Sequence, residues 1–229
     1  MPFRDGPRPA LELTGPVDAP RAAVLLLHGG REHGVDAPPP WNLPRARLRA
    51  FEGAIRRSTA GGDVLMGRVL YRVRGWNGER EDAARDARRA LRELEQLAGD
   101  VPTVLVGHSM GARAALRAAG DPLVRGVVGL APWCPAGEPV AHLRGRRVVL
   151  LHGDQDRTTD PRSSLDFAGR ATAAGAEAAR VVMHGSGHAM LRRAPAWHAL
   201  TGRTVAGILG LAEFPASIAE QFGPTSTSR

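Results

Sequence analysis

Residues 107–111 read Gly-His-Ser-Met-Gly and place Ser109 between two glycines at the end of a short apolar run. A serine hydroxyl is a weak nucleophile, so covalent catalysis needs a base within hydrogen-bond reach, a group that orients this base, and donors for the oxyanion. A Gly-x-Ser-x-Gly segment between a strand and a helix holds its serine on a sharp, strained turn. The pattern predicts that Ser109 is a nucleophile, and a structural turn serine is the alternative in a chain with 28 glycines.

The elements that must position this serine alternate between two kinds of pattern. Six apolar runs are near-continuous in Val and Leu, which is typical of strands covered on both faces. They are expected at residues 22–29, 63–73, 103–108, 126–132, 146–153 and 179–185. Helical spacing is found at residues 44–60, within 79–100 up to a stop at Gly99, and at 112–119, 161–174 and 195–211. The alternation predicts an α/β fold with a mostly parallel central sheet flanked by helices.

A single domain of 229 residues is sufficient for this pattern, with a core over about residues 22–211 and a frayed tail over about 223–229. The net charge of +8 comes with 31 basic residues that are all arginine and are spread along the chain. This distribution indicates a solvated surface, so no nucleic-acid partner is expected. The single cysteine, Cys134, excludes an intramolecular disulfide and most cysteine-based metal sites. We therefore expect no cofactor and no metal.

The first residues contain no apolar segment of the secretory kind, and the apolar run at residues 204–214 is too short to span a bilayer. We therefore expect a cytoplasmic protein with no membrane partner. The patterns do not indicate an oligomeric state.

The strand, the Ser109 turn and the following helix resemble the α/β-hydrolase superfamily, and the likeness extends over roughly residues 22–211. In that family the catalytic residues follow the chain order serine, acid, histidine. The resemblance places the acid in the segment LLHGDQDRTTDP at residues 150–161. The absence of an inserted lid makes the chain similar to small carboxylesterases and dienelactone-hydrolase-like enzymes, although the latter commonly use a cysteine nucleophile.

Three aspartates in this segment are candidates for the acid. Similar proteins carry it three residues after the glycine that ends the strand, here Gly153, which favours Asp156. Asp154 directly follows that glycine, where a role in a turn is the other interpretation. Asp160 precedes a proline at the start of a predicted helix and is typical of an N-cap.

The resemblance implies that the base lies in a glycine-rich loop after the last strand. Gly-Ser-Gly-His at residues 185–188 fits this pattern and makes His188 the expected base. His184 ends the strand and is expected to pack. His108 and His152 are expected to be structural, because one should project from the turn in another direction and the other ends a strand.

The oxyanion hole of this fold uses the backbone N–H of the residue after the nucleophile, here Met110, and a second N–H from a loop after an earlier strand. His28, Gly29 and Gly30 resemble the His-Gly-Gly signature of that loop. The second donor is Gly30 or Arg31. A glycine permits closer backbone approach, which favours Gly30.

Three further residues follow predicted strand ends and are candidates for substrate binding: Arg31, Trp41 and Trp133. The link at residues 133–145 holds two prolines and two glycines and has no room for a lid domain. We expect a serine hydrolase that cleaves an ester or thioester of a small molecule through an acyl-enzyme. An acyltransferase or peptidase using the same residues, and a noncatalytic binding protein of this fold, are the alternatives.

Overall fold

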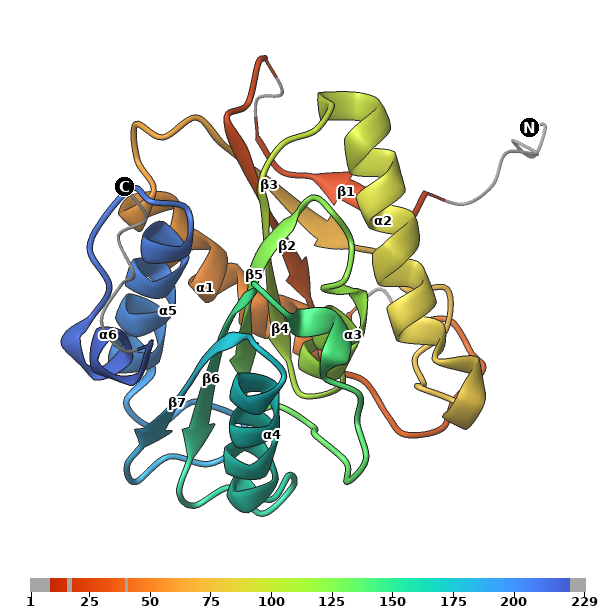
Figure 1. Ribbon diagram of the computed structural model, residues 1–229. Helices are drawn as coiled ribbons and strands as arrows, with labels where there is room; N and C mark the ends of the chain where they lie inside the picture. Colours follow the sequence, from red (N-terminus) through yellow and green to blue (C-terminus); the bar gives the residue numbers. More distant parts are fainter. Residues whose placement is uncertain (1–8, 16–17, 40, 223–229) are drawn as a thin grey trace.

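The computed structural model describes residues 9–15, 18–39 and 41–222, so the expected frayed tail at residues 223–229 lies outside the described part. Seven strands form one sheet in the order β1-β3-β2-β4-β5-β6-β7 (Figure 1). All neighbouring pairs are parallel except β1 and β3. The strands are β1 Leu11–Leu13, β2 Ala22–Leu27, β3 Val64–Val69, β4 Thr103–His108, β5 Val124–Leu130, β6 Arg147–Gly153 and β7 Glu177–Met183.

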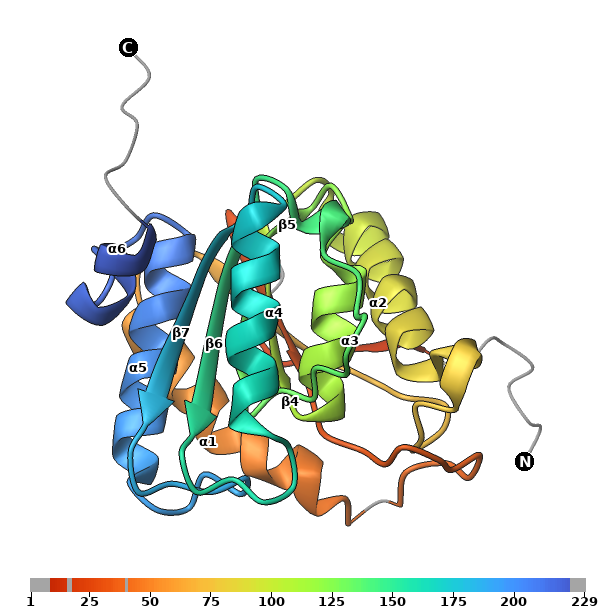
Figure 2. The ribbon, with the colours of Figure 1, turned by 60° about the horizontal axis from the view of Figure 1, so that its bottom comes forward.

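Helices cover both faces of the sheet (Figure 2). One face is covered by α1 Leu43–Ser58, α5 Ala194–Ile208 and α6 Ala216–Phe222, and the other by α2 Asp82–Ala98, α3 Met110–Ala118 and α4 Pro161–Ala173. Two short 3-10 helices, η1 Gly78–Arg80 and η2 Ala141–Leu143, lie in the connections. The expected mostly parallel sheet flanked by helices is confirmed.

The core has two layers, one on each side of the sheet. Alternate side chains of a strand enter opposite layers, so Leu25 and Leu27 of β2 pack toward α2 and α3 whereas Val24 and Leu26 pack toward α1 and α5. Because both faces are covered, every residue of β2 is buried. This explains the continuous apolar runs of the sequence.

Local signals in the sequence set the helix ends. Asp160 accepts a hydrogen bond from the Arg162 N–H at 2.9 Å, and Pro161 is the first residue of α4. The N-cap interpretation of Asp160 is therefore confirmed. After α2, Gly99 adopts a φ of 72° and its N–H donates to the Glu95 carbonyl, which ends the helix as expected.

The structure differs from the expectation at three places. β1 has three residues and α6 has seven, and neither is long enough to show a periodic pattern in the sequence. The strand expected at residues 63–73 ends at Val69. Beyond it the chain leaves the sheet and pairs with the loop after β2, where the Gly75 N–H donates to the Gly34 carbonyl at 2.9 Å.

The parallel strands end at one edge of the sheet, the lower edge in Figures 1 and 2, where the arrowheads of β6 and β7 point. The connection between β5 and β6 consists of residues 131–146 with only the short η2, so no lid domain is inserted there. Of the helices within the described ranges, none combines the length and the apolar character that a membrane crossing requires.

Candidate active site

Ser109 lies between β4 and α3, at the carboxyl edge of the central strand. It adopts φ 55° and ψ −118°, a left-handed backbone conformation that is costly for a residue with a side chain. Its N–H donates to the Leu130 carbonyl at the end of β5 at 3.0 Å, which fixes the turn on the neighbouring strand. A half-buried serine hydroxyl is thereby held at the end of the sheet.

The two glycines of the pentapeptide permit this turn. A Cβ on Gly107 would collide with the carbonyl of Gly111, and a Cβ on Gly111 would collide with the carbonyl of Leu27. The start of α3 therefore packs backbone against backbone on the ends of β4 and β2. This close approach accounts for both glycines flanking Ser109.

Asp156 and His188 form a hydrogen-bonded pair beside the turn. His188 Nδ1 lies 2.8 Å from Asp156 Oδ2, and the N–H groups of Thr158 and Thr159 donate to Oδ1 at 2.8 and 3.0 Å. The Thr159 hydroxyl donates to Oδ2 at 3.0 Å. Burial alone raises the pKa of Asp156, but the donors, led by His152 and His188, lower that pKa well below its usual range. Asp156 is therefore a carboxylate that accepts the Nδ1–H of His188.

His108 connects this pair to the serine turn. Its Nε2 donates to the His188 carbonyl at 3.1 Å, and the two imidazole rings lie 4.9 Å apart. Burial, with a smaller effect from the nearby His188, lowers the pKa of His108 to about 3, so its ring is neutral. Because His108 directly precedes Ser109, this contact holds the His188 loop against the turn. No hydrogen bond in the described part of the chain joins Ser109 to His188.

The expected oxyanion loop follows β2 and touches the start of α3. The His28 ring contacts the Gly29 carbonyl through Nδ1 at 2.7 Å and accepts from the Asn42 amide at 3.3 Å. Burial lowers the pKa of His28 to about 4, so this ring is also neutral. A Cβ on Gly30 would overlap the Met110 side chain, which places that glycine directly beside the first residue of α3.

The two candidate second donors differ in how their backbone is used. The Arg31 N–H donates to the Arg74 carbonyl at 3.0 Å. Neither the Gly30 N–H nor the Met110 N–H has an acceptor among the described residues. The Met110 N–H is the first of α3, where helix geometry leaves amide donors unpaired.

The remaining histidines form contacts of other kinds. His184 Nδ1 lies 3.0 Å from Asp154 Oδ2 in an exposed pair. His152 is fully buried, with Nδ1 2.9 Å from Ser164 Oγ and Nε2 3.3 Å from Asp156 Oδ2. Ser164, His152 and Asp156 thus form a second serine, histidine and aspartate group. Ser164 is inaccessible to solvent, so a substrate has no access to it.

The residues predicted to bind substrate lie around the same edge in different environments. Trp41 and the Arg31 side chain are exposed, and Trp41 is 77% accessible. Trp133 is half-buried, and its ring lies 6.1 Å from that of Trp76. The guanidinium of Arg113 stacks on both indoles. Trp76, like Trp41 and Trp133, follows a predicted strand end and was a candidate aromatic wall of the site. Arg113 was not predicted, because its proximity to the two indoles arises only from tertiary packing.

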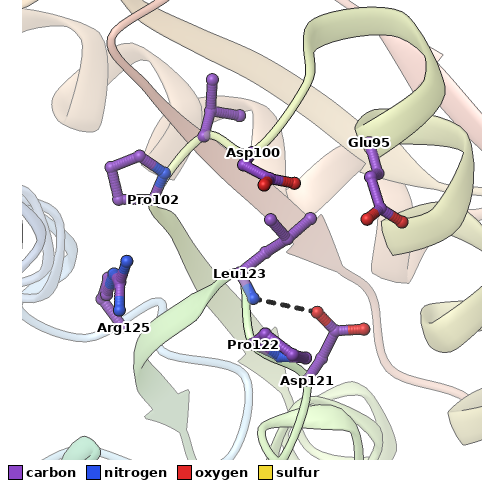
Figure 3. A pocket seen from close by; sticks show the side chains of 8 residues that line it. Glu95, Asp100, Pro102, Asp121, Pro122, Leu123 and Arg125 are labelled. Carbon is purple, nitrogen blue, oxygen red and sulfur yellow. Dashed lines mark hydrogen bonds between the residues drawn. The ribbon is translucent and has the colours of Figure 1, made fainter.

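A cavity of about 330 Å³ at the other end of the sheet does not include these residues (Figure 3). It lies before β4 and β5, and Asp121 in its wall accepts a hydrogen bond from the Leu123 N–H. Three of its side chains, Glu95, Asp100 and Asp121, are acidic. Over the described ranges, no group of three or more His, Cys, Asp or Glu side chains has a metal-binding arrangement.

The family model described as Alpha/beta hydrolase family matches residues 24–200 of the chain. Among solved structures, an alpha-beta serine hydrolase homologue from Coxiella burnetii is 19% identical with a TM-score of 0.62, and the match covers 86% of this chain and 91% of that one. Among curated proteins, none matches the sequence.

Two other solved structures have a similar fold. A serine hydrolase without lid from Xanthomonas campestris is 16% identical with a TM-score of 0.60, over 90% of this chain and 89% of that one. Est1E from Butyrivibrio proteoclasticus, solved with ferulic acid bound, is 12% identical with a TM-score of 0.62, over 87% and 95%. At such identities the structural likeness shows the fold alone.

Proposed function

The chain belongs to the alpha/beta hydrolase family, and we propose that it is a serine hydrolase that cleaves a small carboxylic ester or thioester through an acyl-enzyme on Ser109. Membership of this family supports hydrolase activity. The residues assigned below, the covalent intermediate and the substrate class are our proposal.

One observation carries the assignment. The Asp156 carboxylate accepts the Nδ1–H of His188 at 2.8 Å, and the backbone of His188 is held by the residue that precedes Ser109. An imidazole with Nδ1–H bound to a carboxylate has Nε2 free to accept a proton, which is the form a general base requires. His188 Nε2 has no hydrogen-bond partner within the described residues.

The proposed reaction begins when Ser109 Oγ attacks the acyl carbonyl carbon and its proton passes to His188 Nε2. Asp156 keeps the imidazole in the reactive tautomer and stabilises its charged form. The imidazolium then gives its proton to the leaving alkoxide or thiolate, which departs and leaves an ester between Ser109 and the acyl group. Water, activated by His188, hydrolyses this ester to release the acid and restore the serine.

The oxyanion of each tetrahedral intermediate would be held by the N–H groups of Met110 and Gly30. The Met110 N–H lies at the amino end of α3, where the helix dipole favours negative charge. Gly30 is the better second donor, because the Arg31 N–H already donates to the Arg74 carbonyl. Removing one such donor typically lowers kcat by about 10²- to 10³-fold.

Labelling with a fluorophosphonate probe tests the nucleophile. The wild-type protein is expected to be labelled and Ser109→Ala to lose the label. Ser164→Ala is the matched control, because that serine contacts His152, which in turn contacts Asp156, but has no exposed surface. Ser164→Ala should therefore keep the label.

Labelling that persists in Ser109→Ala, in a variant whose circular dichroism and melting curve match the wild type, would contradict the proposal. Loss of label in Ser164→Ala with an unchanged fold would transfer the assignment to the buried group. Hydrolysis of p-nitrophenyl acetate by the same variants gives a second, independent readout.

A further inference from the structure

A cavity of about 280 Å³ lies next to the Ser109 turn and is lined by residues of four segments at the carboxyl edge of the sheet. Glu32 and His33 come from the loop after β2, Trp76 from the loop after β3, and Arg113 and Trp133 from α3 and the loop after β5. Two of the lining residues are hydrogen-bonded to the backbone of Ser109. The Ser109 carbonyl accepts hydrogen bonds from the N–H of Arg113 at 3.2 Å and from the N–H of Trp133 at 3.3 Å.

The Arg113 side chain is held rigidly in this cavity. Its guanidinium carbon lies 3.9 Å from the ring centre of Trp76 and 4.5 Å from that of Trp133. Its Nε donates to the buried Glu138 carboxylate at 2.7 Å. Stacking on indole faces is favourable for a cation, and the fixed position means that little side-chain entropy is lost when a ligand binds.

The outer half of the guanidinium has unused donors. Nη1 and Nη2 have no hydrogen-bond partner in the described part of the chain, and neither belongs to the buried atoms without partners there. These two nitrogens therefore reach the solvent space of the cavity that Arg113 lines. A guanidinium presents its N–H groups as a planar fork with no acceptor, and this geometry matches a carboxylate.

The need to neutralise the buried Glu138 carboxylate does not by itself explain why Arg113 is at this position. The Nε of Arg117 lies 3.3 Å from the other oxygen of that carboxylate, so a second guanidinium compensates the buried charge. Arg117 lies one helical turn further along α3 and lines a different cavity, with Arg88 and His142. Arg113 differs in that it lines the cavity next to the Ser109 turn.

We propose that this cavity binds a carboxylate at the end of the acyl chain, so that the preferred substrates are half-esters of short dicarboxylic acids. This inference rests on the proposed function. His188 must protonate the leaving group, so the leaving group lies toward the loops after β6 and β7. The acyl chain then extends to the other side of Ser109, where the loops after β2 and β3 supply Glu32, His33 and Trp76 to the cavity.

The acyl chain is expected to be short. Arg113 follows Ser109 by about one helical turn, since four residues of α-helix advance about 6 Å. Glutarate, with three methylene groups between its carboxyl carbons, is the appropriate first probe. Hydrolysis consumes one water and converts mono-p-nitrophenyl glutarate into glutarate and p-nitrophenol.

The experiment compares this half-ester with p-nitrophenyl pentanoate, which has the same number of acyl carbons and no carboxylate. The wild-type protein is expected to have the higher kcat/KM for the half-ester. Arg113→Met/Glu138→Gln removes the fork together with its buried partner and should lower the ratio of the two kcat/KM values by about 10- to 100-fold, as expected for loss of hydrogen bonds to a charged group. Arg147→Met/Glu177→Gln makes the same change of charge at an ion pair on the first residues of β6 and β7, outside the cavity, and should keep the wild-type ratio.

A wild-type preference for the pentanoate, or an equal loss of both activities in the Arg113 variant, would overturn the carboxylate assignment and leave the proposed function standing. An equal change of the ratio in the Arg147 variant would also overturn it, because the effect would then come from general charge. Wild-type protein that hydrolyses neither ester would contradict the proposed function, and the substrate assignment with it.

Discussion

Two Asp–His pairs connect the loop after β6 to the loop after β7, and they differ mainly in their surroundings. His188 lies 2.8 Å from Asp156, and His184 lies 3.0 Å from Asp154. The Asp156 side chain is inaccessible, whereas those of Asp154 and His184 are 37% and 75% exposed. A hydrogen-bonded aspartate and histidine are therefore not sufficient to indicate a catalytic pair. The two pairs differ in the number of donors around the carboxylate and in the burial of that carboxylate.

The close packing of the two loops produces this difference. A Cβ on Gly153 would collide with the carbonyl of Ser186, so the loops meet backbone to backbone directly after the strands. The Gln155 N–H donates to the Ser186 carbonyl at 3.0 Å. Asp154 and Asp156 flank Gln155, and only Asp156 enters the layer where Thr158 and Thr159 supply donors.

The largest difference between the pairs is expected in catalysis. Asp156→Asn should lower kcat on a p-nitrophenyl ester by about 10⁴-fold, because an amide does not hold the imidazole in the reactive tautomer. The matched variant Asp154→Asn should keep kcat within about twofold, since the exposed pair does not contact His188. The reverse ranking would assign the acid to Asp154, and equal losses would show that both loops act through the fold.

The next largest effect is expected for stability in acid, where the buried histidines His28 and His108 should differ from the exposed His184. The pKa of His28 is lowered to about 4 and that of His108 to about 3, in both cases chiefly by burial. The unfolded chain takes up protons near the ordinary histidine pKa of about 6.5, whereas these folded rings stay neutral. Their contribution is fully present above pH 6.5 and is lost as the pH falls toward 4. Denaturant unfolding should therefore give a lower free energy of unfolding at pH 4.5 than at pH 7.

His108→Gln tests whether His108 causes this pH dependence of the free energy of unfolding. Glutamine keeps a side-chain N–H donor for the His188 carbonyl but does not take up a proton, so the difference between pH 7 and pH 4.5 should shrink. His184→Gln, in the exposed pair, should leave that difference as in the wild type. A free energy of unfolding that is equal at the two pH values in the wild-type protein would contradict the assignment of neutral buried histidines.

A smaller effect is expected at the second histidine of Asp156. His152 Nε2 faces two acceptors at 3.3 Å, the Thr159 carbonyl and Asp156 Oδ2, so this nitrogen carries the proton. His152→Leu removes that donor and should lower the free energy of unfolding by about 1–3 kcal/mol. His152 is the first of the donors that lower the pKa of Asp156, so its loss should also raise that pKa.

His184→Leu is the control for this loss of stability, because the exposed pair does not touch Asp156. Its free energy of unfolding should change little. An unchanged free energy of unfolding in His152→Leu, or an equal loss in His184→Leu, would contradict the role of His152 as a donor to Asp156.

The sequence predicted those parts of the fold and site that depend on local patterns. The buried strands were visible as apolar runs, and Ser109, Asp156 and His188 each follow one of them within three residues of a glycine. Contacts between distant segments had no such signal. The His108 bond to the His188 carbonyl spans 80 residues. The stacking of Arg113 on Trp76 and Trp133 likewise depends on three segments that meet only after folding.

The smallest expected effect belongs to the exposed pair itself. The hydrogen bond from His184 is the main cause that lowers the pKa of Asp154, and the Gly185 N–H also donates to this carboxylate at 2.7 Å. A lowered aspartate pKa adds stability that is present above the ordinary value near 4 and is lost below it. Asp154→Asn keeps an acceptor for Gly185, so the melting temperature at pH 7 should fall only slightly in low salt. In about 1 M salt, where the Debye length is about 3 Å, the difference from the wild type should vanish. A fall that persists in high salt would show that Asp154 holds the loop of His188 by hydrogen bonding, and the two pairs would then be linked rather than separate.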